Sequence, residues 1–180
     1  MVVYGDVFIF LTKLWTIGHR RTKKMIELFT DGASSGNPGP GGYGVILRSG
    51  PHYKELSQGF RKTTNNRMEL LAVIKGLEAL KNPNQSVMIY SDSKYVIDSI
   101  EKKWVYGWLQ KGFKDKKNKD LWLRYLEISK LHNIKFTWVR GHNGHPENER
   151  CDELAVAAYK QKDLLIDTVF EAESAKTNIF

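Results

Sequence analysis

The chain has 180 residues, of which 41% are hydrophobic and 27% charged, a composition typical of a globular protein with one hydrophobic core. Its 28 Lys and Arg outnumber its 20 Asp and Glu, giving a formal net charge of +8. This charge favours a polyanionic partner, either nucleic acid or an anionic membrane surface. The single cysteine excludes an internal disulfide framework. Because no zinc-type spacing of Cys and His occurs either, a metal would need oxygen ligands.

Residues 1–24 differ in composition from the rest of the chain. Apolar runs at Val7–Leu11 and Leu14–Ile17 are broken by Lys13 and followed by the basic run Gly18–Lys24. This pattern is too short for a transmembrane helix, and its charge follows the apolar part, whereas a secretory signal has it in front. Three interpretations stay open: a translated upstream extension, an organelle-targeting peptide or a basic arm. We favour the first, because the regular domain pattern begins at Met25.

The first half of the regular pattern predicts three antiparallel strands. They are expected over residues 25–30, 43–48 and 54–60, joined by short turns. The glycine-rich run 36–44 lacks the Gly-x-Gly-x-x-Gly and Walker patterns and precedes no helix, so we interpret it as a tight turn that lets backbone approach a substrate.

The second half alternates helices and strands. We expect a helix capped by Asn at residues 65–66 and ending before Pro83, helices over 94–103, 120–131 and 147–162, and strands over 86–91 and 134–139. Asp92-Ser93 ends the first of these strands and caps the next helix. The prediction is one α/β domain over 25–162, with a five-stranded mixed sheet of three antiparallel and two parallel strands flanked by helices. Residues 163–180 are expected to be a partly disordered tail.

Four acids occur at comparable positions in these elements. Asp31 and Asp92 end strands, while Glu69 and Asp152 lie in the first turns of helices. Strand ends in an open α/β sheet converge on one crevice, and carboxylates gathered there repel unless cations neutralise them. Two magnesium ions would meet this need. Taken singly, Glu69 and Asp92 are better interpreted as ordinary acids at helix N-termini.

Five blocks of sequence resemble type 1 ribonuclease H of the bacterial kind, in one order from about Met25 to about Tyr159. The blocks are Phe29-Thr30-Asp31-Gly32, the run Gly36 to Gly44, Thr63 to Leu70, Asp92-Ser93-Lys94-Tyr95-Val96, and Trp138 to Leu154. The resemblance implies a ribonuclease H-like fold and an endonuclease that hydrolyses the RNA strand of RNA/DNA hybrids to 3′-hydroxyl and 5′-phosphate ends. It further implies two Mg²⁺ ions, with Mn²⁺ as an alternative.

The resemblance also assigns roles to individual residues. Asp31, Glu69, Asp92 and Asp152 match the family's metal-binding acids, and His142 matches a loop histidine that assists proton transfer or product release. Without the resemblance, His142 would be interpreted as an ordinary loop residue. The resemblance implies that Asn37, Asn66 and Lys94 line the minor groove of the hybrid, and that Asn65 and Arg67 also bind the substrate. It further implies a basic protrusion that grips the DNA strand, with Trp104, Trp108, Lys111 and Lys114.

Three departures from the family pattern affect the expected substrate contacts. Lys94 stands where many members carry Gln, and Ser34 stands where some have Cys. The loop from Lys114 to Asp120 is several residues shorter than in the enterobacterial form. We expect a cytoplasmic monomer, or an organellar one if residues 1–24 are a targeting peptide, with no membrane association and no stable protein partner. The rival functions are a hybrid-binding module without catalysis and a DNA nuclease or recombinase of the same fold.

Overall fold

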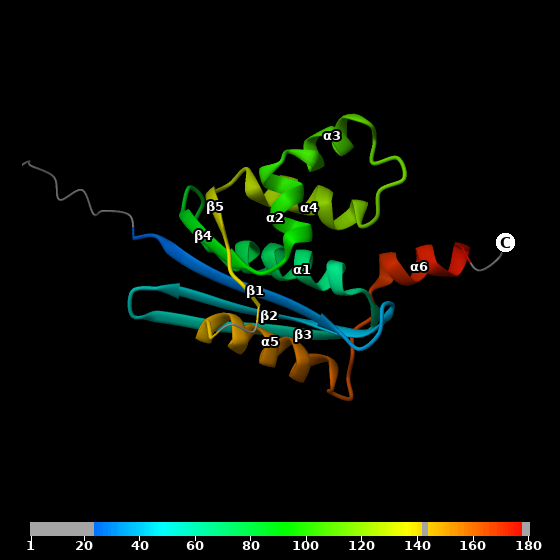
Figure 1. The fold of residues 1–180 in the computed structure, drawn as a ribbon, viewed down its shortest axis with the longest axis horizontal. Coiled ribbons are helices and arrows are strands. Elements are labelled where there is room, and N and C mark those ends of the chain that lie inside the picture. Colours follow the sequence, from blue (N-terminus) through cyan, green and yellow to red (C-terminus); the bar gives the residue numbers. More distant parts are fainter. Residues whose placement is uncertain (1–23, 142–143, 178–180) are drawn as a thin grey trace, which may run out of the picture.

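The computed structural model describes residues 24–141 and 144–177 (Figure 1). The interpretations of the N-terminal segment and of His142 therefore lie outside the described residues, apart from Lys24. In the part of the chain that is described, no helix is long and apolar enough to cross a membrane.

The described residues contain one five-stranded sheet with the order β3-β2-β1-β4-β5. Strands β1 (Ile26–Ser34), β2 (Gly39–Ser49) and β3 (His52–Thr63) form an antiparallel meander. Strands β4 (Ser86–Ser91) and β5 (Asn133–Trp138) add to it in parallel, with β4 beside β1. The predicted mixed sheet is confirmed.

Helices cover both faces of this sheet. They are α1 (Asn65–Glu78), α2 (Lys94–Glu101), α3 (Trp104–Gln110), α4 (Lys119–Ser129), α5 (Pro146–Tyr159) and α6 (Thr168–Thr177). Helices α1 to α4 lie on one side of the sheet and α5 lies on the other (Figure 1). The larger hydrophobic cluster fills the space under α1, which is buried almost continuously from Arg67 to Leu77.

The two predicted caps have different outcomes. The side chain of Ser93 caps α2 by accepting a hydrogen bond from the backbone N–H of Val96 at 3.3 Å, as predicted. The predicted Asn cap of α1 is wrong, because the N-cap residue is Thr64 and it makes no side-chain cap hydrogen bond. Asn65 is instead the first helical residue, and its amide is directed to an acid of the site described below.

The second part of the glycine run forms strand β2, where the sequence pattern predicted a turn. Gly44 lies in β2 directly beneath α5, and a Cβ atom added to it would lie 2.0 Å from the carbonyl oxygen of Cys151. Because glycine has no side chain, the backbone of α5 can pack closely on the sheet at this point. Cys151, the single cysteine, is fully buried there against Phe29 and Ile46.

Residues 163–177 are ordered, contrary to the expected partly disordered tail. Leu165 pairs in parallel with Phe60 at the edge of β3, and its N–H donates to the carbonyl of Gly59 at 3.0 Å. Two residues later Asp167 is buried, and α6 begins directly after it. A strand-like bridge, a buried acid and a helix thus hold this segment on the domain.

Candidate active site

Three of the predicted acids meet at one end of the sheet. Asp31 from β1, Glu69 from α1 and Asp92 from the end of β4 each offer a carboxylate oxygen, and these oxygens all lie within 4.8 Å of one another. Strands β1 and β4 are adjacent and parallel, so their carboxyl ends lie together and bring Asp31 and Asp92 to one edge. This part of the predicted site is assembled as the strand topology requires.

Two glycines allow the surrounding backbone to close around these acids. A Cβ atom at Gly32 would lie 2.2 Å from the backbone nitrogen of Glu69, so glycine is needed for α1 to approach β1 here. A Cβ atom at Gly141 would lie 2.4 Å from Oδ2 of Asp92. The chain after β5 therefore also depends on a glycine to pass beside the acid cluster.

Burial and repulsion both disfavour ionisation within the cluster. Burial, followed by the charge of Asp92, raises the pKa of Asp31 to about 8, although the N–H of Gly32 donates to its Oδ1 at 2.7 Å. Burial, followed by the charge of Asp31, raises the pKa of Glu69 well above its usual range. Such shifts indicate a site that is short of positive charge.

Two buried oxygens of the cluster have no hydrogen-bond donor. The side chain of Asn65 donates to Oε1 of Glu69 at 3.2 Å, but Oε2 of Glu69 and Oδ1 of Asp92 are buried without a partner. Buried polar atoms normally have one, so each such atom needs an explanation. Unpaired carboxylate oxygens that lie close together are the ligands that a hard divalent cation prefers.

The fourth predicted acid, Asp152, lies further from the centre of the cluster. Its charge contributes to the raised pKa of Asp31 and of Glu69, which places it within electrostatic range. It is half-buried on α5 and is not part of the close trio of carboxylates among the described residues. His142 lies outside the described residues.

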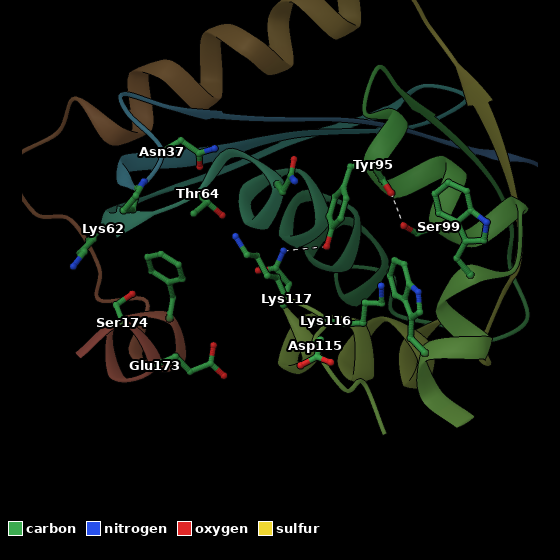
Figure 2. A pocket seen from close by; sticks show the side chains of 16 residues that line it. Asn37, Lys62, Thr64, Tyr95, Ser99, Asp115, Lys116, Lys117, Glu173 and Ser174 are labelled. Carbon is green, nitrogen blue, oxygen red and sulfur yellow. Dashed lines mark hydrogen bonds between the residues drawn. The ribbon is translucent and has the colours of Figure 1, made fainter. Parts of the chain in front are cut away.

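A groove of about 890 Å³ (Figure 2) is lined in part by Asn66 of α1, the helix that carries Glu69, and by Tyr95 of α2, the helix that follows Asp92. Four predicted substrate-binding residues line it: Asn37, Asn66, Trp104 and Trp108. Further lining comes from Thr64, Tyr95 and Ser99, from the loop that carries Lys116 and Lys117, and from Lys62, Asp115, Asn118, Phe170, Glu173 and Ser174. Basic and aromatic side chains along an open groove are typical of surfaces that bind single nucleic acid strands.

The sequence comparisons agree with this arrangement. The family model described as RNase H matches residues 23–160, and a ribonuclease H of Desulforamulus reducens is 58% identical over 149 residues, covering 80% of this chain and 93% of that protein. The chain belongs to the ribonuclease H family. Ribonucleases H are endoribonucleases that act on RNA/DNA hybrids, and the acid trio of this ribonuclease H is consistent with a metal site.

Solved structures give the same result for the fold. The structure described as LC9-RNase H1, a type 1 RNase H with the type 2 active-site motif, is 31% identical, with a TM-score of 0.69 over 77% of this chain and 73% of that one. LC11-RNase H1 in complex with an RNA/DNA hybrid is 25% identical, with a TM-score of 0.56 over 75% of this chain and 96% of that one. The ribonuclease H-like fold expected from the sequence is therefore confirmed.

One predicted substrate-binding residue of this ribonuclease H faces inward. The side chain of Arg67 is only 2% exposed. Its guanidinium donates to both carboxylate oxygens of Asp120 at 2.8 Å, and to those of Asp167 at 2.7 and 2.8 Å. Because its donors are satisfied inside the protein, the structure assigns Arg67 to internal ion pairs and not to a phosphate of the substrate.

Lys94 and the exposed Trp138 flank the acids of this ribonuclease H on the β5 side. The ammonium of Lys94 lies 5.3 Å from the centre of the Trp138 ring, and the indole N–H of Trp138 donates to the backbone carbonyl of Asp92 at 3.1 Å. Sequence reasoning assigned no role to Trp138, although an aromatic residue immediately before the loop 139–146 could have drawn attention. Lys111 and Lys114 are exposed and do not line the groove.

Proposed function

We propose that this chain holds two Mg²⁺ ions at its acid cluster and cuts the RNA strand of RNA/DNA hybrids, leaving 3′-hydroxyl and 5′-phosphate ends. The observation that carries the proposal is the close trio of Asp31, Glu69 and Asp92, in which the pKa values of Asp31 and Glu69 are raised and one buried oxygen each of Glu69 and Asp92 has no hydrogen-bond partner. When bound there, the ions supply an activated water and stabilise the leaving oxygen.

Each acid has a proposed role in holding the ions. Asp31 is proposed to contact both, because it belongs to the close trio with Glu69 and Asp92 and its pKa is also raised by the charge of Asp152. Glu69 and Asp92 are proposed to hold the ion on the leaving-group side, and Asp152 the ion that activates water. The greater distance of Asp152 from the trio supports a role at the second ion. His142 is proposed to assist proton transfer or product release.

The groove residues are proposed to position the hybrid. Side-chain amides such as those of Asn37 and Asn66 both donate and accept hydrogen bonds, so they suit the minor-groove edge where 2′-hydroxyls mark the RNA strand. Asn65 is proposed to act near the same edge while it orients Glu69. Lys94 is proposed to contact the RNA strand beside Asp92, with its cation held over Trp138.

The DNA strand is proposed to lie in the aromatic and basic part of the groove. Trp104 and Trp108 offer surfaces for sugars, and Lys116 lies 5.5 Å from the Trp108 ring centre, where it can meet a phosphate. Lys111 and Lys114 are proposed to add phosphate contacts beyond the groove. The hybrid bound to LC11-RNase H1 supports this kind of partner.

The setting of the reaction is a further part of the proposal. We propose that the protein acts as a monomer in the cytoplasm, with Mn²⁺ able to replace Mg²⁺. The free, buried Cys151 is compatible with a reducing compartment.

Cleavage of a hybrid with end-labelled RNA tests the proposal. We expect Mg²⁺-dependent cuts within the RNA strand, products ending in 3′-hydroxyl and 5′-phosphate groups, and loss of cleavage on chelation. Single-stranded RNA and duplex DNA of the same sequence are the controls. Tight hybrid binding with no cleavage in Mg²⁺ or Mn²⁺, or equal cutting of duplex DNA, would contradict the proposal.

A further inference from the structure

Helix α6 forms one wall of the groove, although it lies beyond the residues 23–160 that match the family model. Phe170, Glu173 and Ser174 of α6 line the groove together with Asn37, Thr64 and Trp108. Figure 2 shows Glu173 extending from α6 toward the loop that carries Asp115 and Lys117. A segment outside the matched domain thus contributes to the surface where the substrate is proposed to bind.

Buried and bidentate contacts fix this wall in place. Asp167, directly before α6, accepts hydrogen bonds from Arg67 and from the hydroxyl of Thr63 at 2.8 Å. Within α6, Glu171 accepts from the guanidinium of Arg61 on β3 at 2.8 to 3.3 Å. A charge carried by α6 therefore has a defined position relative to the groove.

Basic side chains outnumber acids along the groove, and one of its acids is on α6. Lys62, Lys116 and Lys117 line the groove with positive charge, whereas Asp115 and, on α6, Glu173 contribute carboxylates. Glu171 also pairs with Arg61, a neighbour of Lys62, and so reduces the positive charge at this end. Because phosphate binding depends on the summed charge of the surface, an acid on the wall weakens the hold on a polyanion.

We propose that α6 is an electrostatic wall of the substrate groove, in which Glu173 limits how tightly the nucleic acid backbone is held. This inference rests on the proposed function, because it requires a nucleic acid strand in the groove. Glu173 acts on binding and release of the strand, and has no part in the chemical step at the acid cluster.

The test compares dissociation constants for one RNA/DNA hybrid in an Asp31→Asn background, which prevents cleavage during the measurement. Adding Glu173→Gln is expected to lower the Kd about two- to fivefold at low salt, and Glu173→Lys to lower it further. The difference is expected to disappear at high salt, since exposed charges are screened. Glu153→Gln makes the same charge change on α5, on the other side of the sheet (Figure 1), where its side chain is 64% exposed, and is expected to leave the Kd unchanged.

The outcomes separate the two proposals. If the Asp31→Asn protein binds no hybrid, the proposed function fails. If it binds but Glu173→Gln and Glu173→Lys match it in Kd, or if Glu153→Gln lowers the Kd as much, the inference about α6 fails. With Asp31 intact, the single-turnover cleavage rate at saturating enzyme is expected to be the same for Glu173→Gln and the parent, and a loss of that rate would assign Glu173 to the chemical step and overturn the proposal.

Discussion

Asp31 and Glu69 are held in a state that opposes their ionisation until positive charge is supplied. Both are buried, both lie beside other carboxylates, and one oxygen of Glu69 has no donor. A cation would relieve the repulsion between the carboxylates and would also give the unpaired oxygen a partner. The burial and mutual repulsion of these carboxylates are therefore what a site built to hold cations is expected to show in the absence of the cations.

The pH dependence of stability provides a residue-scale prediction for the metal-free protein. The folded-state pKa of Asp31 is about 8, against 3.8 as the reference value, so between these values the folded state holds a proton that the unfolded state has released. The free energy of unfolding in a chelator is therefore expected to fall as pH rises through this window, with a slope of up to about 1.4 kcal/mol per pH unit for one group.

Urea denaturation across this pH range measures the effect. Asp31→Asn is the control, and its stability is expected to depend less on pH. Adding Mg²⁺ is expected to restore stability most at the alkaline end, where the carboxylates are ionised. If the free energy of unfolding of the metal-free protein rises from pH 4 to pH 8, the raised pKa of Asp31 is contradicted.

Arg67 gives a second residue-scale prediction. Replacing it with Met leaves the buried Asp167 and the partly buried Asp120 without their shared cation, and is expected to cost about 3 to 5 kcal/mol of unfolding free energy. Arg124→Met is the matched control, because it breaks a more exposed pair with Glu78 and is expected to cost less than about 1 kcal/mol. If chemical denaturation shows equal losses of unfolding free energy for the two variants, the buried ion pairs of Arg67 do not stabilise the fold more than an exposed pair does.

At the scale of elements, the docking of α5 on the sheet depends on glycines of β2. Gly44→Ala would place a methyl group against the backbone of Cys151 and is expected to destabilise the fold by about 2 to 4 kcal/mol. Gly107→Ala is the control, since its Cβ would meet nothing within 4 Å, and in helix α3 it is expected to be neutral or slightly stabilising. A Gly44→Ala protein with the parent melting temperature would show that α5 does not need this close approach.

The sequence predicted most elements because their hydrophobic periods are local. The strand 86–91 was predicted with its observed bounds, and the helices near 65–78 and 94–101 were predicted to within a few residues. Helix α3 was missed because its apolar side chains are partly exposed and Gly107 weakens the helical pattern. The start of β2 was missed because glycine and proline normally indicate a turn. Gly42 in this strand instead allows close packing against Ala155 of α5, a helix more than a hundred residues later in the chain.

At the scale of the whole molecule, contacts distant in sequence explain what remained unpredicted. The partners of Arg67 lie 53 and 100 residues away, so nothing near Arg67 distinguishes a buried ion pair from a phosphate ligand. The order of residues 163–177 depends on the same partners and on the edge of β3. That Asp31 and Asp92 lie together was predictable because parallel strand ends share one edge of the sheet. Glu69 lies on a helix, and it was assigned to the site through the family resemblance.

The molecule as a whole combines a cluster of buried carboxylates with a groove in which basic side chains outnumber acidic ones. The sheet brings Asp31 and Asp92 together, α1 contributes Glu69 to the site and Asn66 to the groove, and α6 closes the far wall. In the proposed function, catalysis and strand binding are therefore assigned to different side chains of the same elements. A substitution in the acid cluster is therefore expected to abolish cleavage while hybrid binding is retained.

Parallel assays of the parent and Asp31→Asn, with one labelled RNA/DNA hybrid in Mg²⁺, test this central claim most directly. We expect Asp31→Asn to lower the cleavage rate by about 1,000-fold or more, since a metal ligand acts on the transition state itself, while hybrid affinity stays within a few fold of the parent. Cleavage by Asp31→Asn at close to the parent rate would contradict the account, because Asp31 would then lie outside the active site.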